Sequence, residues 1–296
     1  MTSSGSLPSL LTRTIFDAQK TETTPGEKVR SEGQGPVADA AVNRVYDNLG
    51  VVHEFYSTVY GRDSLTHNHE PLRATVHFSR GNPEKELIWT GTQLLVPEGF
   101  EPIFGDLTLG LDLLANTISR QLFWPDAPLT NQGQSGALLN SIGDVFGSLV
   151  QQYARQQNAE QADWLIGADV LTPGIAGDAL RSLKAPGTAY DHPLLGGKDP
   201  QPAHMDDYAH APHDNGGVHA NSGIPNHAFY LLATKWGGNA WERAGKVWYD
   251  ALTSRSLRSD ATFADFARLT TTTAATLYGD SESRAVKEAW NKVGVA

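Results

Sequence analysis

The sequence contains no cysteine among its 296 residues. The fold therefore uses no disulfide bond, and thiol catalysis and thiolate metal sites are excluded. The sequence also has no run of about 18 apolar residues, the length that a membrane-spanning helix requires. Its first eleven residues, MTSSGSLPSLL, lack the basic start and apolar core of a secretory signal. We therefore expect a soluble chain whose compartment stays open, and secretion without a recognisable signal peptide is one possibility.

Positive charge is scarce. The chain has 23 Lys and Arg against 33 Asp and Glu, which gives a formal net charge of −10. Phosphate binding requires a basic face, so nucleic acids and anionic membranes are not expected as main partners. Hydrophobic residues make up 40% of the chain. At this length they suffice for one large domain or for two lobes that share a cleft.

Hydrophobic periodicity divides the chain into a strand-rich first part and a helical second part. Strands are predicted over residues 12–21, 72–80 and, as a pair around a turn, 86–99. Helices are predicted over residues 37–61, 110–122, 137–157, 224–236, 239–254, 261–277 and 282–292. Pro- and Gly-rich segments over residues 23–36 and 184–226 indicate a turn-rich link and one long ordered loop. We expect an α+β fold with a β-rich lobe over residues 1–122, ending in a central helix, and a mainly α-helical lobe over residues 123–296.

Several stretches occur in the order found in one known family. They are RTIFDAQ, TTPGEKVRSEGQGP, TVHFSRG, WTGTQLLV, SGALLNSIGDVFGSLV, WLIGADVLTPGIAGDALRSL, DNGGVHANSGIPNHAFYLL and LYGDSESRAVKEAWNKVGV. Together they cover nearly the full length, and the chain resembles the thermolysin-like metallopeptidases, most closely their protealysin-like branch. The resemblance implies the two-lobe fold of that family, with the central helix at the cleft between the lobes. It does not by itself imply the activity, because one fold can carry several functions.

In this family an active member carries HExxH on the central helix, where two His bind zinc and the Glu polarises the attacking water. The corresponding stretch here, GLDLLANTISRQL, has Asn116 and Arg120 at the His positions and Thr117 at the Glu position. The third ligand, a Glu on the next helix, corresponds to Asn140. Asn is a poor zinc ligand, Thr cannot serve as the base, and Arg is a permanent cation. We therefore expect a catalytically inactive homologue, a pseudopeptidase that binds no zinc.

Other parts of the family site are kept. DNGGVH resembles the segment that supplies a transition-state-stabilising His, here His219, held by Asp214. GDALRS resembles the segment with a substrate-binding Arg, here Arg181, and Asp144 corresponds to an Asp that orients a zinc-binding His. The oxyanion-binding Tyr of the family corresponds to Asn131.

The acidic residues that bind calcium in the family are only partly present. Asp112 and Asp163 match them, whereas Gln151, Leu165 and Ala168 stand at acidic positions. We expect calcium to be absent or weakly bound, and no metal or other cofactor to be used.

The main hypothesis is that the old substrate cleft binds a peptide or protein through pairing with an edge strand at ELIWTG. The expected ligand-binding residues are Arg120, Arg181, His219, Asn116, Asn140 and Glu86. A guanidinium at position 120 would suit a carboxylate or a peptide carbonyl. Alternatively, Arg120 only pairs with Asp144 and seals the old site.

Two enzymatic alternatives remain. His219 and Asp214 form a possible dyad for another type of enzyme, with Thr117 or Ser119 as the only local nucleophiles. A metallopeptidase with a non-standard metal site would need other ligands. Two groups of histidines are candidates: His204, His210, His213 and His219 in one loop, and His67 with His69.

Trp124, just after the central helix, is either a core residue or an anchor for a partner. The sequence leaves open the ligand, the biological role, the oligomeric state and the export route.

Overall fold

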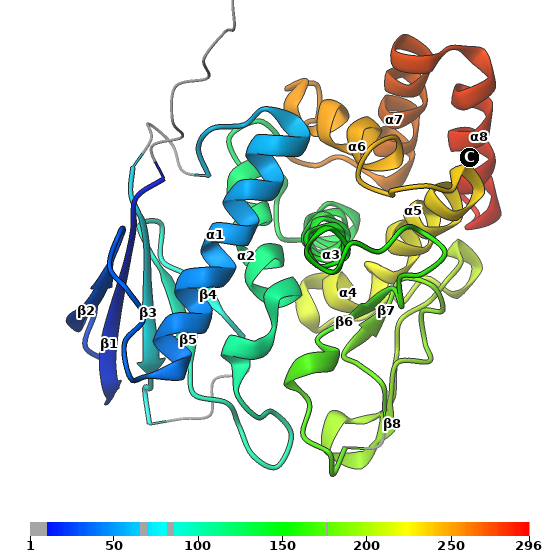
Figure 1. The fold of residues 1–296 in the computed structure, drawn as a ribbon. Helices are drawn as coiled ribbons and strands as arrows, with labels where there is room; N and C mark the ends of the chain where they lie inside the picture. The colour runs from blue at the N-terminus through cyan, green and yellow to red at the C-terminus, as the bar shows by residue number, and fades with distance from the viewer. Residues whose placement is uncertain (1–10, 66–69, 82–85, 176, 296) are drawn as a thin grey trace, which may run out of the picture. The chain divides into compact units, whose positions relative to one another are not determined.

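A computed structural model describes residues 11–65, 70–81, 86–175 and 177–295 (Figure 1). The chain forms two compact units, Met1–Gly99 and Phe100–Ala296. The first contains the large sheet and one long helix, and the second is mainly helical. The predicted α+β fold, with a β-rich N-terminal part and a helical C-terminal part, is confirmed.

The first unit is built on a five-stranded sheet in the order β2-β1-β3-β5-β4. The strands are β1 (Arg13–Thr21), β2 (Glu27–Ser31), β3 (Leu72–Phe78), β4 (Ile88–Trp89) and β5 (Leu94–Pro97). Strands β1, β3 and β5 are parallel to one another, whereas β2 and β4 are antiparallel to their neighbours. Parallel strands require a crossover connection. Helix α1 (Ala40–Tyr60) is part of the crossover from β1 to β3 and packs against both strands.

Local sequence explains the limits of α1. The side chain of Asp39 accepts hydrogen bonds from the amides of Ala41 and Val42 and so caps the first turn. Gly61 ends the helix in the left-handed conformation, with φ at 66°. Apolar residues at helical spacing, Val45 and Leu49 among them, are fully buried. These signals made the helix predictable from the sequence.

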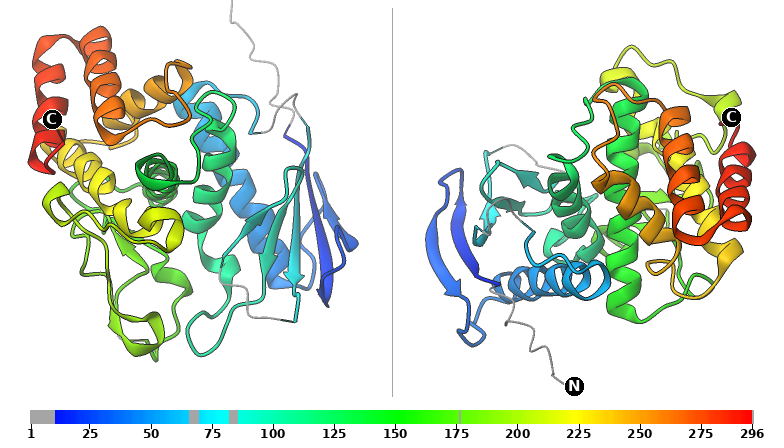
Figure 2. Two further views of the ribbon diagram at one scale, coloured as in Figure 1. Left: turned by 180° about the vertical axis from the view of Figure 1, so that it is seen from behind. Right: turned by 90° about the horizontal axis from the view of Figure 1, so that it is seen from above.

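The second unit contains seven helices among its described residues. They are α2 (Leu111–Phe123), α3 (Gly133–Arg155), α4 (Asp214–Asn221), α5 (Gly223–Trp236), α6 (Ala244–Thr253), α7 (Phe263–Tyr278) and α8 (Asp280–Lys292). Short two-residue strands form two small hairpin-like pairs: β6 (Leu165–Ile166) with β7 (Arg181–Ser182), and β8 (Asp191–His192) with β9 (Gly197–Lys198). Helix α3 contacts α2, α4, α5 and α7 and runs through this unit (Figure 2). It is therefore buried almost throughout, from Ser135 to Gln152.

Close packing joins α2 to α3. A Cβ atom added at Gly147 would lie 2.5 Å from the carbonyl oxygen of Asp112 on α2, so only glycine allows this approach. Helix α2 thus belongs to the compact second unit. The division of the chain into lobes at residue 122 stays a prediction.

The sequence analysis missed strand β2, helix α4 and the four short strands β6 to β9. Strand β2 lies in the segment predicted as a turn-rich link, and α4 lies in the segment predicted as one long loop. Helix α4 was hidden because Asn215, Gly216 and Gly217 have left-handed φ angles of 48°, 87° and 78°. Such a stretch has the composition of a turn.

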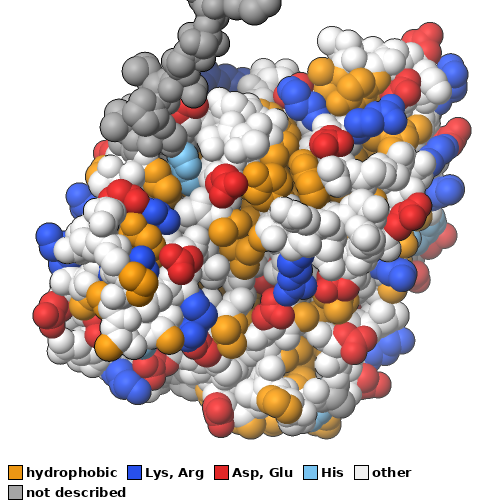
Figure 3. All heavy atoms as spheres, in the orientation of Figure 1, with side chains coloured by type: hydrophobic (Ala, Val, Ile, Leu, Met, Phe, Trp, Pro, Cys, Tyr) orange, Lys and Arg blue, Asp and Glu red, His pale blue; other side chains and the backbone are white. Residues whose placement is uncertain are grey.

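No helix in the described ranges combines the length and apolarity that crossing a membrane requires. On the face drawn in Figure 3, basic and acidic side chains are interspersed. The expectation that nucleic acids are not main partners stays a prediction from the net charge.

Candidate active site

A buried carboxylate, Asp144 on α3, is the centre of a hydrogen-bond network in the second unit. Its side chain is 1% exposed. The guanidinium of Arg181 on β7 binds it in bidentate fashion, with Nε 2.8 Å from Oδ2 and Nη2 2.8 Å from Oδ1. Two amides complete the shell. Asn116 Nδ2 on α2 donates to Oδ1 at 2.9 Å, and Asn226 Nδ2 on α5 donates to Oδ2 at 2.9 Å.

This network connects four elements, α2, α3, α5 and β7. A buried carboxylate is tolerated only when a cation or several hydrogen bonds compensate it, and Asp144 has both. The cation that binds Asp144 is Arg181, whereas the sequence reading considered Arg120 for that place. Arg120 lies partly buried on α2, and its predicted role in ligand binding stays a prediction.

Asn116 fits its place because the facing residue is glycine. A Cβ atom at Gly143 would lie 2.6 Å from Asn116 Oδ1 and 2.7 Å from Nδ2. Real side chains do not approach so closely, so any residue larger than glycine at 143 would displace the Asn116 amide. The network around Asp144 therefore depends on a specific pair, Asn116 and Gly143.

The other positions of the family motif form local bonds. Thr117 Oγ1 donates to the Leu113 carbonyl at 3.1 Å, and Asn140 Nδ2 donates to the Gly136 carbonyl at 2.9 Å. Both bonds run one turn back along the same helix. Ser119 does the same with Ala115 and is fully buried. Neither Thr117 nor Ser119 is thus presented as a free nucleophile.

The donor set at positions 116, 117, 120 and 140 does not fit zinc. Zinc in proteins is bound by imidazole, thiolate or carboxylate, and these positions offer two amides, a hydroxyl and a guanidinium. The amide nitrogen of Asn116 is already used as a donor to Asp144. We therefore derive no catalytic step through a metal at these four residues.

His219 and Asp214 are brought together as the sequence suggested. His219 Nδ1 lies 2.5 Å from Asp214 Oδ1, and the His219 amide donates to Asp214 Oδ2 at 2.9 Å. The His219 side chain is 51% exposed, so one face of the ring is open to solvent. The two contacts from one carboxylate fix both the backbone and the ring of His219.

The histidines proposed as an alternative metal site do not form one in the described residues. His204 Nδ1 accepts from the amide of Asp206 in its own turn. Within the described ranges, the group of His, Asp and Glu side chains close enough to share an ion is Asp17, Asp39 and His77, in the first unit. His67 and His69 lie outside the described residues. Trp124 is 46% exposed, so the expectation that it packs in the core is wrong.

The residues that match the family's calcium ligands are found in two settings. Asp112 on α2 is fully buried and accepts from the amides of Gly167 at 2.6 Å and Leu113 at 2.8 Å. Burial raises the pKa of Asp112 to about 6. Asp163 and Asp169 lie near the guanidinium of Arg155, at 3.5 Å and 2.6 Å.

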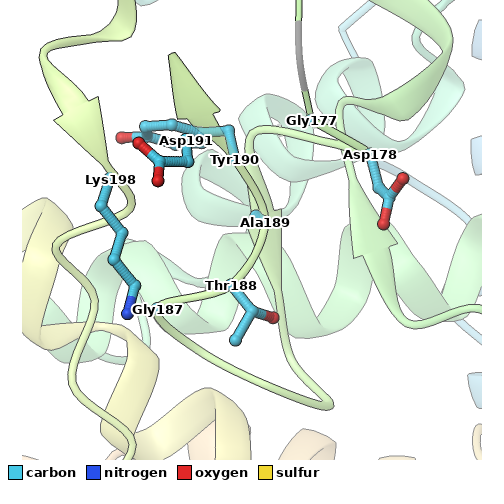
Figure 4. A pocket seen from close by; sticks show the side chains of 8 residues that line it. All are labelled: Gly177, Asp178, Gly187, Thr188, Ala189, Tyr190, Asp191 and Lys198. Atoms are coloured by element: carbon cyan, nitrogen blue, oxygen red, sulfur yellow. The ribbon is translucent and has the colours of Figure 1, made fainter. Parts of the chain in front are cut away.

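A pocket of about 370 Å³ lies beside β8 and β9 in the second unit (Figure 4). It is lined by two acidic side chains, one lysine, one tyrosine and small residues: Gly177, Asp178, Gly187, Thr188, Ala189, Tyr190, Asp191 and Lys198. Figure 4 shows Asp178 well apart from Asp191 and Lys198. A Cβ atom at Gly177 would lie 2.6 Å from that of Tyr190, so glycine is needed where the two segments meet. The sequence did not single out this pocket.

Comparison with known proteins identifies the family. The sequence model of one protein family, the thermolysin metallopeptidase alpha-helical domain, matches residues 127–295, more than half of the chain. The chain belongs to the thermolysin metallopeptidase family. The family predicted from the sequence motifs is confirmed.

Relatives and a solved structure match nearly the whole chain. An extracellular metalloprotease of Pectobacterium carotovorum subsp. carotovorum is 45% identical over 96% of this chain and 81% of its own length. Protease PrtS of Photorhabdus sp. (strain Az29) is 44% identical over 96% of this chain and 76% of its own length. The precursor of protealysin, a metalloproteinase from Serratia proteamaculans, has a TM-score of 0.93 and 46% identity. That match covers 97% of this chain and 88% of the protealysin chain.

These relatives contradict the expectation of a pseudopeptidase. They are named as proteases and metalloproteases at 44–45% identity over most of the chain. The predictions of a non-enzyme and of a protein without zinc or calcium are wrong on the same finding. The prediction of an inactive protein without zinc rested on the side chains at positions 116, 117, 120 and 140, whereas the sequence similarity to the named proteases extends over most of the chain.

Proposed function

We propose that this chain is an extracellular, metal-dependent protease that hydrolyses peptide bonds in proteins. The observation that carries the proposal is the 45% identity to an extracellular metalloprotease over 96% of the chain. The fold supports it as well, because the protealysin precursor shares it at a TM-score of 0.93. Secretion is part of the proposal and is supported by the names of the relatives.

An extended peptide would be held by an edge strand. Strand β4 is the last strand of the first unit's sheet, and it pairs with β5 on one side only among the described residues. A peptide that adds to such an edge gains main-chain hydrogen bonds independent of its sequence. Glu86, two residues before β4, is exposed and would influence which side chains are accepted.

His219 would assist the reaction. When Nδ1 donates its proton to Asp214, Nε2 is the ring nitrogen that remains available to a substrate. When protonated, Nε2 can donate to an oxygen that gains negative charge, and when neutral it can accept a proton. Arg181, whose side chain is 23% exposed, would contribute to substrate binding beside Asp144.

Because positions 116, 117, 120 and 140 do not fit zinc, we assign no metal ligand among them.

The test is cleavage of a quenched fluorescent protein substrate by the purified full chain. The chain is first treated with a chelator and then supplied with zinc, manganese or calcium. We expect metal-dependent cleavage that falls at least tenfold in His219→Gln and is unchanged in His210→Gln, an exposed histidine of the same loop. Absence of cleavage under every metal condition would overturn the proposal. Equal cleavage by His219→Gln and the unaltered chain would show that His219 takes no part.

A further inference from the structure

The parallel strands of the first unit bring four ionisable side chains to one edge of the sheet. Asp17 lies in the C-terminal half of β1, His77 near the end of β3, and Glu98 directly follows β5. Because β1, β3 and β5 are parallel, their carboxyl ends meet at the same edge. The N-terminus of α1 adds Asp39 to this edge, and the ligand atoms of Asp17, Asp39 and His77 all lie within 4.8 Å of one another.

His77 is the centre of the group. Its Nδ1 lies 3.0 Å from Asp17 Oδ1, which is hydrogen-bonding distance. Its Nε2 lies 3.6 Å from Asp39 Oδ2 and 4.0 Å from Glu98 Oε1. When Nδ1 donates its proton to Asp17, Nε2 carries a lone pair that faces two carboxylates. That arrangement is favourable only with a positive charge between them.

The spacing suits a metal ion. Nitrogen and oxygen ligands lie about 2.0–2.2 Å from zinc. Two such ligands at a tetrahedral angle are therefore about 3.4 Å apart, close to the 3.6 Å between His77 Nε2 and Asp39 Oδ2. Metal-binding histidines also commonly donate their other ring N–H to a carboxylate. Asp17 stands in that relation to His77.

Irregular backbone in β1 and β3 orients these side chains toward one another. The pairing of β1 with β3 shifts between Asp17 and Thr21, and the pairing of β3 with β5 shifts between Thr75 and Phe78. His77 has a φ of 51°, which a strand residue other than glycine rarely adopts. Bulges of this kind redirect side chains at functional sites. Asp39 caps α1 with Oδ1, so Oδ2 is the oxygen that faces His77.

We propose that Asp39 and His77 bind one divalent transition-metal ion, best matched by zinc, that Asp17 orients His77, and that the carboxylate of Glu98 lies nearby without binding the ion directly. The charge agrees with a divalent ion. Three carboxylates carry −3, and Lys20, whose Nζ lies 2.9 Å from Glu98 Oε2, adds +1. With His77 neutral the group has a net charge of −2, which one divalent ion balances. The side chains of His77 and Asp39 are 23% and 38% exposed, so water can complete the coordination.

This site is separate from the active site of the proposed protease. All its residues belong to the first unit, and none is among the residues discussed for catalysis. The ion would link the end of β3 to the start of α1. Its expected effect is therefore on the stability of the first unit, and its presence can be tested without an activity assay.

The test is calorimetric titration of the chelator-treated full chain with zinc, repeated with cobalt, whose visible absorption reports nitrogen and oxygen ligands. We expect His77→Gln to lose one bound ion per chain and its cobalt bands. Asp39→Asn should weaken binding at least tenfold, and it keeps the helix cap because Asn caps as well as Asp. Asp17→Asn should weaken binding by 10- to 100-fold without removing a ligand. His210→Gln is the matched control and should bind as the unaltered chain does.

Two results would overturn the proposal. One is equal stoichiometry and affinity in the unaltered chain, His77→Gln and Asp39→Asn, with each variant folded as judged by far-ultraviolet circular dichroism. The other is no ion bound by the unaltered chain. Failure of the proposed protease activity would leave the loss of one ion in His77→Gln unaffected, so the two proposals fail separately.

Discussion

Replacing Arg181 by Gln should reveal how strongly the second unit depends on the network at Asp144. The substitution removes the bidentate guanidinium and leaves the Asp144 carboxylate, 1% exposed, with only the two amide donors. Removing one partner of a buried ion pair costs about 3–5 kcal/mol. Water reaches Arg181, whose side chain is 23% exposed, and the amides of Asn116 and Asn226 remain, so we expect a loss of about 2–4 kcal/mol.

The cause of this loss can be separated from simple loss of packing. In Asp144→Asn with Arg181→Gln the buried charge is absent, so the double variant should recover at least half of the stability lost by Arg181→Gln alone. The coupling energy between the two positions is then about 2 kcal/mol, within the range found for residues in one network. Arg258→Gln, which breaks the exposed pair with Asp260, should leave the unfolding midpoint unchanged.

The assay is urea unfolding followed by circular dichroism and tryptophan fluorescence, at pH 7 and constant ionic strength. Coincident transitions by the two probes license a two-state free energy. If the effects of the two single substitutions add within about 0.5 kcal/mol, the network does not behave as a coupled unit. The account of Asp144 as a charge that Arg181 compensates would then be refuted.

Three further predictions use other features of the second unit. Because burial raises the folded-state pKa of Asp112 from 3.8 to about 6, the native state binds more protons than the unfolded state between these values. The free energy of unfolding should therefore fall by up to about 3 kcal/mol as the pH rises through that window. Urea unfolding of Asp112→Asn at a series of pH values should lack this fall, because the amide does not ionise. Gly143→Ala should destabilise by about 1–3 kcal/mol because its Cβ meets the Asn116 amide, and adding Asn116→Ala should partly reverse this in urea unfolding. Restoring His, Glu, His and Glu at positions 116, 117, 120 and 140 should increase zinc affinity at least tenfold by calorimetry, and a folded variant without this gain would contradict the assignment of these positions.

The fold was predictable where local signals and burial agree. Helix α1 has a capping Asp39, a terminal Gly61 and buried apolar residues at helical spacing, so its limits follow from the sequence. Strand β2 was missed because three of its five residues, EKVRS, are charged, and only its pairing with β1 defines it. Helix α4 was missed because its left-handed residues resemble a turn. In both cases non-local hydrogen bonds overrode a weak local preference.

The candidate site was predictable only where the family motif marks it. The His219–Asp214 pair is separated by five residues and follows from the DNGGVH segment. The ion pair of Asp144 with Arg181 joins residues 37 apart, and no spacing rule connects them. The group at His77 is harder still, because its members come from three strands and a helix cap. Such a set has no sequence pattern, and only the parallel pairing of β1, β3 and β5 brings it together.

The metal question therefore divides into two independent measurements. At Asp144, a carboxylate that would orient a histidine ligand in the family accepts instead from the Asn116 amide. The carboxylate is present while the donor differs, which is why restoring the four motif residues is expected to improve zinc binding. At His77, an imidazole and the carboxylate of Asp39 already lie at a distance suited to an ion. A chain that binds one ion and loses it in His77→Gln has its metal in the first unit, whereas an ion retained in that variant must be bound elsewhere. Peptidase activity that follows the retained ion would then identify the catalytic metal of this protein.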